Sequence, residues 1–313
     1  MSTGAETVAV IDVGSNSIKL LVARHSEQGL EAVLSQTIET RISAGISQSH
    51  PFLLPEAMDA GVATIVELYD LAQSYAPAAM QIVATSAVRD AGNREQFIAK
   101  VRAATRLELR VLSGIEEAGY IGKGIACDPQ VVGTEDFVQM DIGGGSLELI
   151  RFVCGKIEQA ISLQLGAVRL TERFLRDKTP AIRPETKTEI RQHVAKVISA
   201  SGFNLADQQL PMVVTGGAFV ISRAILGFRA GEDLNSSAPK LTYAALSALE
   251  SELSALSLAE RSQVDLLPSA RADIVPVALI TILQVLEMAE CESVLHSFYN
   301  LRYGIAAELL ERF

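Results

Sequence analysis

The sequence predicts an α/β protein of two domains, each built on a mixed sheet that is flanked by helices. A chain of 313 residues has room for about two domains of roughly 150 residues each. In the N-terminal part, strand-like and helix-like segments follow the order βββαβαβα, which is typical of a mixed sheet with helices packed on it. A segment near the N-terminus also recurs in the middle of the chain, which indicates a duplicated domain.

The first elements predict a hairpin that continues into a sheet. Strand-like runs at 8–13 and 18–23 flank a turn rich in Gly, Ser and Asn, and a third run at about 31–40 extends them as an edge strand. From Pro55 the apolar residues take helical spacing. The remaining elements of this half are a strand at 81–85, a helix at 94–105, a strand at 109–112 and a helix that begins after Ser113 and Gly114.

The second half repeats this order. A helix is expected at 184–199, because Pro184 suits the first turn and Glu185 suits the helix dipole. The other expected elements are strands at 137–142, 147–153, 156–163, 212–215 and about 294–297, a helix at 168–174, several helices between Gly217 and the strand near 294, and a terminal helix at 305–313 after Gly304.

The domain boundary falls in a segment without low-complexity composition. We expect a first domain at 1–124 and a second at 125–300, joined by a short helical connection near 121–128. The C-terminal segment at about 301–313 is a candidate to pack back on the first domain.

Composition narrows the function classes. Apolar residues make up 49% of the chain, enough for a sizeable core, so neither a disordered chain nor a small disulfide scaffold is expected. The 27 basic and 37 acidic residues give a net charge of −10. This charge argues against a broad nucleic-acid surface, which carries a basic excess, but it allows a local basic cleft.

Cysteines and apolar runs bear on the compartment. Cys127, Cys154 and Cys291 form no CxxC pair, so neither a zinc finger nor a disulfide framework is expected. The N-terminus has no basic segment followed by an apolar core, as a signal peptide would. The most apolar run, 274–286, is too short to span a bilayer. We therefore expect a cytoplasmic protein that contacts no membrane.

The internal repeat is the most informative feature. Residues 11–24 read IDVGSNSIKLLVAR and residues 140–153 read MDIGGGSLELIRFV. In each copy an apolar strand ends in Asp, a turn of small residues follows, and a second strand leaves the turn. One such hairpin alone is most often an ordinary tight turn, but two at domain spacing favour a shared ligand site. We expect the two turns to face each other across a cleft.

These turns have the chemistry of a phosphate clamp. A glycine-rich turn lets backbone N–H groups approach an anion closely. Asp12 and Asp141 end the strands before the turns, and Glu148 shares a strand face with Ser146. Such carboxylates suit a hydrated Mg²⁺ that bridges phosphate oxygens. The turns add side-chain donors from Ser15, Asn16, Ser17 and Ser146.

Other catalytic motifs are missing, and one acidic pair stands out. The sequence has no GxxxxGK[ST], no GxGxxG that opens a helix after the first strand, no GxSxG and no HExxH. The adjacent Glu116 and Glu117 are the conspicuous candidates for a general base. Neighbouring helix residues point about 100° apart, so only one of them can face a cleft. On its own, such a pair is most often solvated helix surface.

Eight short segments, in order over nearly the whole chain, carry a family resemblance. They read DVGSNS (12–17), ATSAVR (84–89), SGIEEA (113–118), DIGGGS (141–146), LGAVRL (165–170), TGG (215–217), RAD (271–273) and LRYG (301–304). Together they resemble the exopolyphosphatase / guanosine pentaphosphate phosphohydrolase family of the actin-like ATPase superfamily. The SGIEEA and DIGGGS segments are the most specific.

The resemblance implies two ribonuclease-H-like (actin-like) domains with the active site in the interdomain cleft. It gives Glu117 the role of base and Arg89 that of a phosphate binder, both counted as catalytic. Metal ligands are expected at Asp12, Asp141 and Glu148. The residues expected to bind phosphate are Gly14, Ser15, Asn16, Ser17, Lys19, Arg41, Gly143, Gly144, Gly145, Ser146, Gly216 and Gly217.

The expected function is Mg²⁺-dependent hydrolysis of the terminal phosphoanhydride of inorganic polyphosphate, with release of orthophosphate by a water that Glu117 activates. Guanosine pentaphosphate 5′-phosphohydrolase is the alternative within enzymes. An actin-like or sugar-kinase-like ATP-binding module is more remote, because the paired Glu favours hydrolysis over transfer. The expected partner is the polyphosphate or guanosine pentaphosphate substrate rather than a nucleic-acid polymer, and a homodimer is left open.

Overall fold

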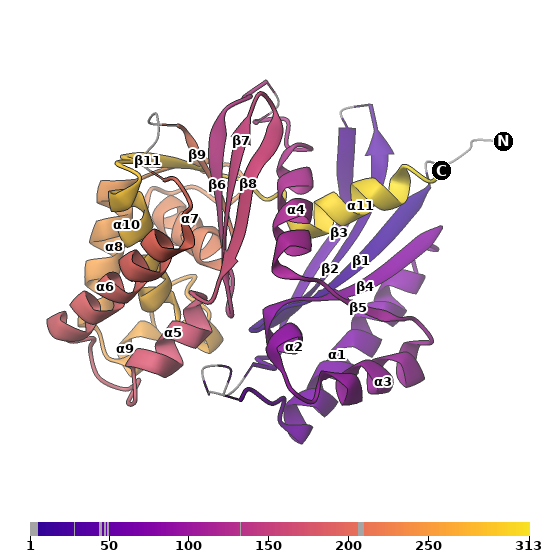
Figure 1. Cartoon of the computed structure of the whole chain (residues 1–313), viewed down its shortest axis with the longest axis horizontal. Helices are drawn as coiled ribbons and strands as arrows, with labels where there is room; N and C mark the ends of the chain where they lie inside the picture. Colours follow the sequence, from indigo (N-terminus) through magenta and orange to yellow (C-terminus); the bar gives the residue numbers. More distant parts are fainter. Residues whose placement is uncertain are drawn as a thin grey trace. The chain divides into compact units, whose positions relative to one another are not determined.

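Two mixed sheets organise the chain, one in each of two units (Figure 1). The structure is a computed structural model that describes residues 6–27, 29–43, 46, 48, 50–131, 133–205 and 210–313. The first unit comprises Met1–Gly133 and Tyr299–Phe313, and the second comprises Thr134–Phe298. The first boundary thus lies nine residues after the expected 124 and the second lies two residues before the expected 300, and the whole of helix α4 (Gly114–Ile125) belongs to the first unit.

The sheet of the first unit has the strand order β3–β2–β1–β4–β5. Its first three strands are antiparallel, whereas β4 and β5 run parallel to β1. The carboxyl ends of β1, β4 and β5 therefore meet at one edge of the sheet. The strands are β1 (Thr7–Val13), β2 (Ser17–Ser26), β3 (Gly29–Glu39), β4 (Ala79–Ala84) and β5 (Leu109–Val111).

Helices cover both faces of this sheet. Helices α1 and α11 both pack on β1 and β2, from opposite faces, and α3 packs on α1 whereas α4 packs on α11 (Figure 1). The C-terminal helix thus returns to the N-terminal sheet. Besides α4, the helices of this unit are α1 (Pro55–Gln73), α2 (Ser86–Asp90), α3 (Arg94–Thr105) and α11 (Leu301–Leu310).

The second unit repeats this plan in the order β10–β11–β9–β6–β7–β8. Strands β6, β7 and β8 are antiparallel, β9 is parallel to β6, and β11 is parallel to β9, so they correspond to β1, β2, β3, β4 and β5. The strands are β6 (Phe137–Ile142), β7 (Leu147–Val153), β8 (Lys156–Leu163), β9 (Met212–Thr215), β10 (Lys240–Thr242) and β11 (Ser293–His296). The expected fold class, two mixed sheets flanked by helices, is confirmed.

Helix α10 is the centre of the helical layer in the second unit. It packs against α5, α6, α7 and α8, and most of its side chains are buried, so the apolar run at 274–286 belongs to the core. Among the residues that the structure describes, no helix combines the length and the apolar character needed to cross a membrane. The helices are α5 (Ala167–Phe174), α6 (Pro184–Ser201), α7 (Gly217–Arg229), α8 (Tyr243–Ala255), α9 (Leu258–Arg261), a 3₁₀ turn (Ser269–Arg271) and α10 (Val275–Met288).

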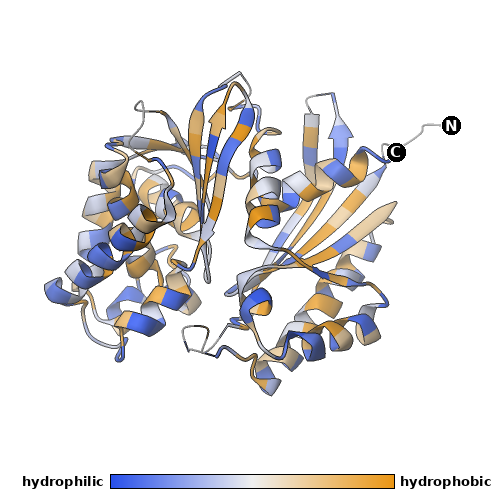
Figure 2. Ribbon diagram, in the orientation of Figure 1, coloured by the Kyte–Doolittle hydropathy of each residue, from blue (hydrophilic) through white to orange (hydrophobic). Residues whose placement is uncertain are grey.

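The strands that flank the β1–β2 and β6–β7 turns are apolar and buried. Val8, Val10 and Ile11 of β1 are fully buried, as are Leu149 and Ile150 of β7. Figure 2 shows apolar residues gathered along the strands of both sheets. Each turn is therefore flanked by buried strands, and these strands fix the position of the turn within its unit.

Three element predictions differ from the structure. Helix α2 and strand β10 were not predicted, since five and three residues show no periodicity. The terminal helix begins at Leu301, where the Asn300 side chain accepts from Arg302 N, rather than after Gly304. Gly304 lies inside the helix, because α11 crosses α4 there: a Cβ on Gly304 would lie 2.0 Å from Tyr120 O.

This crossing predicts a large stability effect from one methyl group. Gly304→Ala should lower the free energy of unfolding by about 2 kcal/mol or more, because neither helix backbone can give way cheaply. Gly119→Ala is the matched control: Gly119 lies on α4, and its Cβ would meet nothing within 4 Å. It should instead stabilise by roughly 0.5–1 kcal/mol through helix propensity. Chemical denaturation of both variants checks this, and equal stability would contradict the tight crossing.

Candidate functional site

The turn between β1 and β2 is held by the segment that follows β3. Gly14 N donates to Ser17 O at 3.1 Å and closes the turn. The Asn16 carbonyl oxygen accepts from Thr40 N at 3.0 Å and from Arg41 N at 2.8 Å. The Ser15 carbonyl oxygen accepts from Ser43 N at 3.2 Å, so the turn is tied into its own unit through two carbonyl groups. Its side chains are buried, namely those of Ser15, Asn16 and Ser17.

Side chains tighten the same turn. The Asn16 amide donates to Glu39, and its Oδ1 accepts from Arg41 Nε at 3.2 Å. Arg41, a predicted phosphate binder, therefore also braces Asn16. It has a positive φ of 45°, an uncommon conformation for a side chain with a Cβ and one that often accompanies function.

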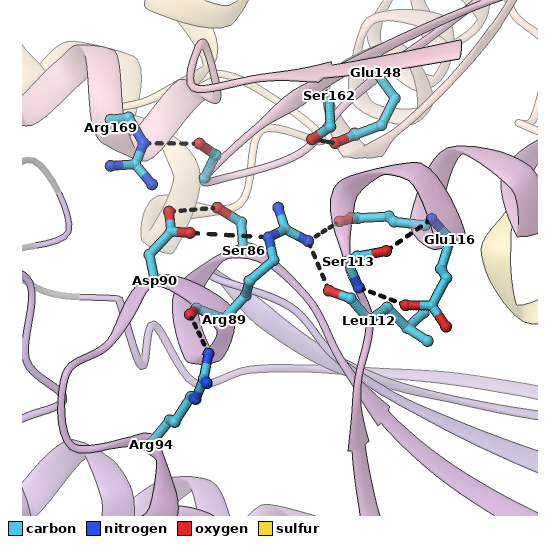
Figure 3. A network of polar contacts seen from close by, with 12 residues as sticks. Ser86, Arg89, Asp90, Arg94, Leu112, Ser113, Glu116, Glu148, Ser162 and Arg169 are labelled. Carbon is cyan, nitrogen blue, oxygen red and sulfur yellow. Dashed lines mark hydrogen bonds and ion pairs between the residues drawn. The ribbon is translucent and has the colours of Figure 1, made fainter.

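The turn between β6 and β7 closes in the same way, with Gly143 N donating to Ser146 O at 3.0 Å. The carbonyl oxygens of residues 143 and 144 accept from the backbone N–H groups of the first three residues of α5, at 2.8–3.2 Å. The carbonyl oxygen of Gly145 accepts from Arg169 Nε at 2.9 Å (Figure 3). All three carbonyls thus point toward α5.

This arrangement sets the direction of three N–H groups. In a planar trans peptide, the carbonyl of one residue and the N–H of the next point to opposite sides. The N–H groups of Gly144, Gly145 and Ser146 therefore point away from α5, and within the described part of the chain they donate to no protein acceptor. Successive free N–H groups on a glycine turn form a cradle for an anion.

The cradle depends on close packing at Gly166, just before α5. A Cβ there would lie 2.4 Å from Gly144 O and equally close to Gly145 C and Ser146 N. Only glycine lets the start of α5 reach the carbonyls of the turn.

In the second unit, two acidic residues sit opposite each other beside the cradle. Asp141 and Glu148 are register partners across β6 and β7, so their side chains share a face of the sheet. Asp141 accepts from the hydroxyl of Thr215. Glu148 accepts from the hydroxyl of Ser162 at 2.7 Å, as Figure 3 shows. These hydroxyls orient two carboxylates next to an anion cradle.

The first unit has a different pair at the equivalent position. Asp12 is the register partner of Lys19, where the second unit has Asp141 opposite Glu148. Asp12 is buried, and within the described residues its Oδ1 has no hydrogen-bond partner. Burial raises the pKa of the Asp12 carboxyl, whereas the charges of Lys19 and Arg302 act in the opposite direction.

The two pairs differ in their fitness for Mg²⁺. Among the described residues, no group of three or more His, Cys, Asp or Glu side chains could hold a metal ion. Mg²⁺ is commonly bound by one or two carboxylates together with water and substrate phosphates. The Asp141 and Glu148 pair meets this requirement, whereas Asp12 stands opposite a lysine in the strand register.

The adjacent glutamates have separate environments. Glu116 is exposed and closes a capping box at the start of α4, accepting from Ser113 N at 2.9 Å and from Arg110 at 2.7 Å. These contacts lower the pKa of Glu116 to about 2, the Ser113 backbone N–H having the largest effect. Glu117 is buried, and its Oε2 accepts from Arg89 Nη1 at 2.6 Å (Figure 3).

Arg89 is positioned by two further contacts. Its Nη1 also donates to Leu112 O at 3.1 Å, and Asp90 lies 3.8 Å from its Nε. Arg89 belongs to α2, which follows β4, and Glu117 belongs to α4, which follows β5. The first turn, Arg89 and Glu117 therefore follow the carboxyl ends of three neighbouring parallel strands, where α/β sheets bind ligands.

The two glycines after β9 have packing roles. Gly216 has a φ of +110°, and a Cβ there would lie 2.5 Å from Ile142 O and 3.2 Å from Asp141 Oδ1. At Gly217, a Cβ would lie 1.9 Å from Arg271 Nη1. Gly216 therefore lets the chain pass Asp141, and Gly217 leaves room for the guanidinium of Arg271.

Three partners of the site were not predicted as site residues. Ser162 and Thr215 hold the acidic pair, and Arg169 holds the cradle. Arg169 stands in the LGAVRL segment, but no local pattern distinguishes a buried arginine from a surface one. The correspondence between β3 and β8 could have found it, because Arg41 and Arg169 follow those two strands.

Known proteins are similar to this chain in sequence and in fold. The model of the Ppx/GppA phosphatase family matches residues 21–313. Exopolyphosphatase 1 of Mycobacterium leprae (strain TN) is 30% identical over 276 residues, which are 85% of this chain and 78% of that protein. An exopolyphosphatase structure from Cytophaga hutchinsonii ATCC 33406 superposes with a TM-score of 0.87 at 24% identity over 98% of each chain.

A second solved structure, the Ppx/GppA family member of Aquifex aeolicus, matches with a TM-score of 0.78 at 23% identity over 99% of each chain. These structures show the shared fold, and the family match covers nearly all of the sequence. The chain therefore belongs to the Ppx/GppA phosphatase family and is a hydrolase of the phosphatase class.

Proposed function

We propose that this protein hydrolyses the terminal phosphoanhydride bond of inorganic polyphosphate and releases orthophosphate. The observation that carries the proposal is the cradle of three N–H groups at residues 144–146, which meet no acceptor among the described residues and lie beside the carboxylates of Asp141 and Glu148. Family membership and the name of the Mycobacterium leprae relative support the choice of polyphosphate.

Phosphate binding falls to backbone groups in this proposal. The N–H groups of Gly144, Gly145 and Ser146 donate to the oxygens of the terminal phosphoryl group. Because carbonyl contacts already fix these donors, they stabilise charge that develops on those oxygens without reorganising. Arg89 adds a positive charge, as is common in phosphoryl transfer.

Glu117 is the proposed general base. It takes a proton from a water molecule, whose oxygen forms a bond to the terminal phosphorus. The bond from that phosphorus to the bridging oxygen breaks in line, and the shortened polyphosphate leaves. The salt bridge to Arg89 supports this role, because it holds a buried carboxylate in one orientation.

Mg²⁺ is the proposed cofactor, and Asp141 and Glu148 would hold it. When bound, the ion neutralises phosphate charge and orients the substrate. Asp12, also expected as a ligand, is a weaker candidate because Lys19 already supplies a positive charge opposite it.

The base assignment predicts a selective loss of turnover. Glu117→Gln should lower kcat by about 10²–10⁴-fold, the usual contribution of a general base, with little change in KM. Glu116→Gln is the control, because that residue caps the helix and is exposed; it should keep kcat within about threefold. Steady-state phosphate release measures both, and a Glu117→Gln enzyme of near-normal rate would contradict the assignment.

The metal assignment predicts a shift in Mg²⁺ requirement. A chelator should abolish phosphate release, and Glu148→Gln should raise the Mg²⁺ concentration for half-maximal activity about 10-fold or more. Glu158→Gln, on the neighbouring strand β8, removes an exposed carboxylate and should leave this concentration unchanged. If Glu148→Gln keeps the wild-type Mg²⁺ titration, Glu148 does not hold the ion.

The substrate assignment is tested by comparing three phosphoanhydrides. Orthophosphate release with Mg²⁺ should be fastest from long-chain polyphosphate, because the phosphate cradle recognises a phosphoryl group and needs no nucleoside. Guanosine pentaphosphate and ATP complete the comparison at equal concentrations. A higher kcat/KM on guanosine pentaphosphate would replace the proposal with the 5′-phosphohydrolase alternative. Orthophosphate release from ATP and from neither of the other two substrates would favour the ATP-binding module.

A further inference from the structure

Arg169 is a buried arginine that touches the anion cradle from behind. Its exposed fraction is only 7%, and its Nε donates to Gly145 O at 2.9 Å (Figure 3). It lies in the first turn of α5, whose backbone holds the two preceding carbonyls of the turn.

The three carbonyls of the turn are held by two different means. Those of Gly143 and Gly144 accept from backbone N–H groups, which any sequence at the start of α5 would supply. The carbonyl of Gly145 accepts from a side chain, that of Arg169. The peptide that joins Gly145 to Ser146 therefore depends on the residue type at 169, and this peptide carries the N–H of Ser146.

We propose that Arg169 is a positioning residue for phosphate binding, which acts by holding the Gly145 carbonyl so that the Ser146 N–H faces the phosphoryl group. This inference rests on the proposed function of the cradle. The bond is charge-assisted and thus stronger than a neutral one. Without it, the peptide between residues 145 and 146 can rotate, and the third donor of the cradle is lost.

The duplicated hairpin contains the same device. Arg41 follows β3 as Arg169 follows β8, and its Nε donates to the side-chain Oδ1 of Asn16 in the first turn. Backbone N–H groups beside each arginine also bond the turn, but at different positions: those of residues 40 and 41 bond Asn16 O, whereas those of residues 168 and 169 bond Gly144 O, which aligns with Ser15. A brace by an arginine Nε thus recurs in both units, on a side-chain amide in one and on a backbone carbonyl in the other.

Two substitutions of equal length separate the hydrogen bond from the charge. In Arg169→Gln, the amide nitrogen takes the position of Nε and can donate to Gly145 O without a guanidinium. In Arg169→Met, a methyl group takes that position and no donor remains. Arg173→Met is the control, since Arg173 is an exposed arginine on the same helix that lies over the Phe174 ring.

The readouts are the Kd for inorganic phosphate by calorimetry, KM and kcat for polyphosphate, and the melting temperature without ligand. Arg169→Met should raise the phosphate Kd and the KM by about tenfold, as expected for one charge-assisted bond. Arg169→Gln and Arg173→Met should stay within about threefold of the wild type. Rescue by Gln distinguishes positioning from a general loss of folding, which the ligand-free melting temperature reports.

Two outcomes decide against the inference. If the Gln variant loses phosphate affinity as the Met variant does, the charge and not the Nε bond matters. If the Met variant binds phosphate normally, the Gly145 carbonyl needs no brace. Should the Met variant not fold, the Gln arm still decides. A wild type that binds phosphate yet hydrolyses no polyphosphate would overturn the proposed function. The phosphate Kd values of the variants would still test the positioning role of Arg169.

Discussion

The carbonyl groups of the two turns determine what the turns can bind. The carbonyl and N–H groups of a glycine-rich turn have no fixed direction by themselves, because its peptide planes rotate at little cost in free energy. In the second unit, all three carbonyls of residues 143–145 are bonded toward α5, so the following N–H groups point away from it. The anion cradle is therefore a consequence of where α5 begins, and the absence of a Cβ at Gly166 allows α5 to begin there.

The two units repeat the same hairpin, but one position gives the two copies different charges. Both units have the same strand order around the hairpin, with an Asp at the end of the first strand. The residue opposite that Asp is Lys19 in one unit and Glu148 in the other. A lysine neutralises the Asp opposite it, whereas two carboxylates opposite each other repel unless a cation binds between them. The same backbone positions thus hold a carboxylate and a lysine in one unit, and two carboxylates suited to bind a cation in the other.

Much of the fold and part of the site could be predicted from local sequence. The repeat of Asp, small turn and strand identified both hairpins, because their pairing is set by neighbours in the chain. The capping box is also a local signal: Ser113 three residues before Glu116 predicts a cap, which leaves Glu117 as the buried partner. Arg169 and Gly304 could not be predicted in this way. Their roles come from contacts with Gly145, 24 residues away, and with Tyr120, 184 residues away.

The acidic net charge and a polyanionic substrate are compatible because the proposed binding groups are local. Backbone N–H groups add positive potential without changing the count of charged residues, and buried arginines act where water screens them least. Arg89 and Arg169 each lie largely out of solvent beside a functional element, and neither requires a basic surface around it. Under the proposed function, a chain with net charge −10 repels a polyphosphate at a distance and binds its end at close range, so its affinity depends on how rigidly a few donors are held.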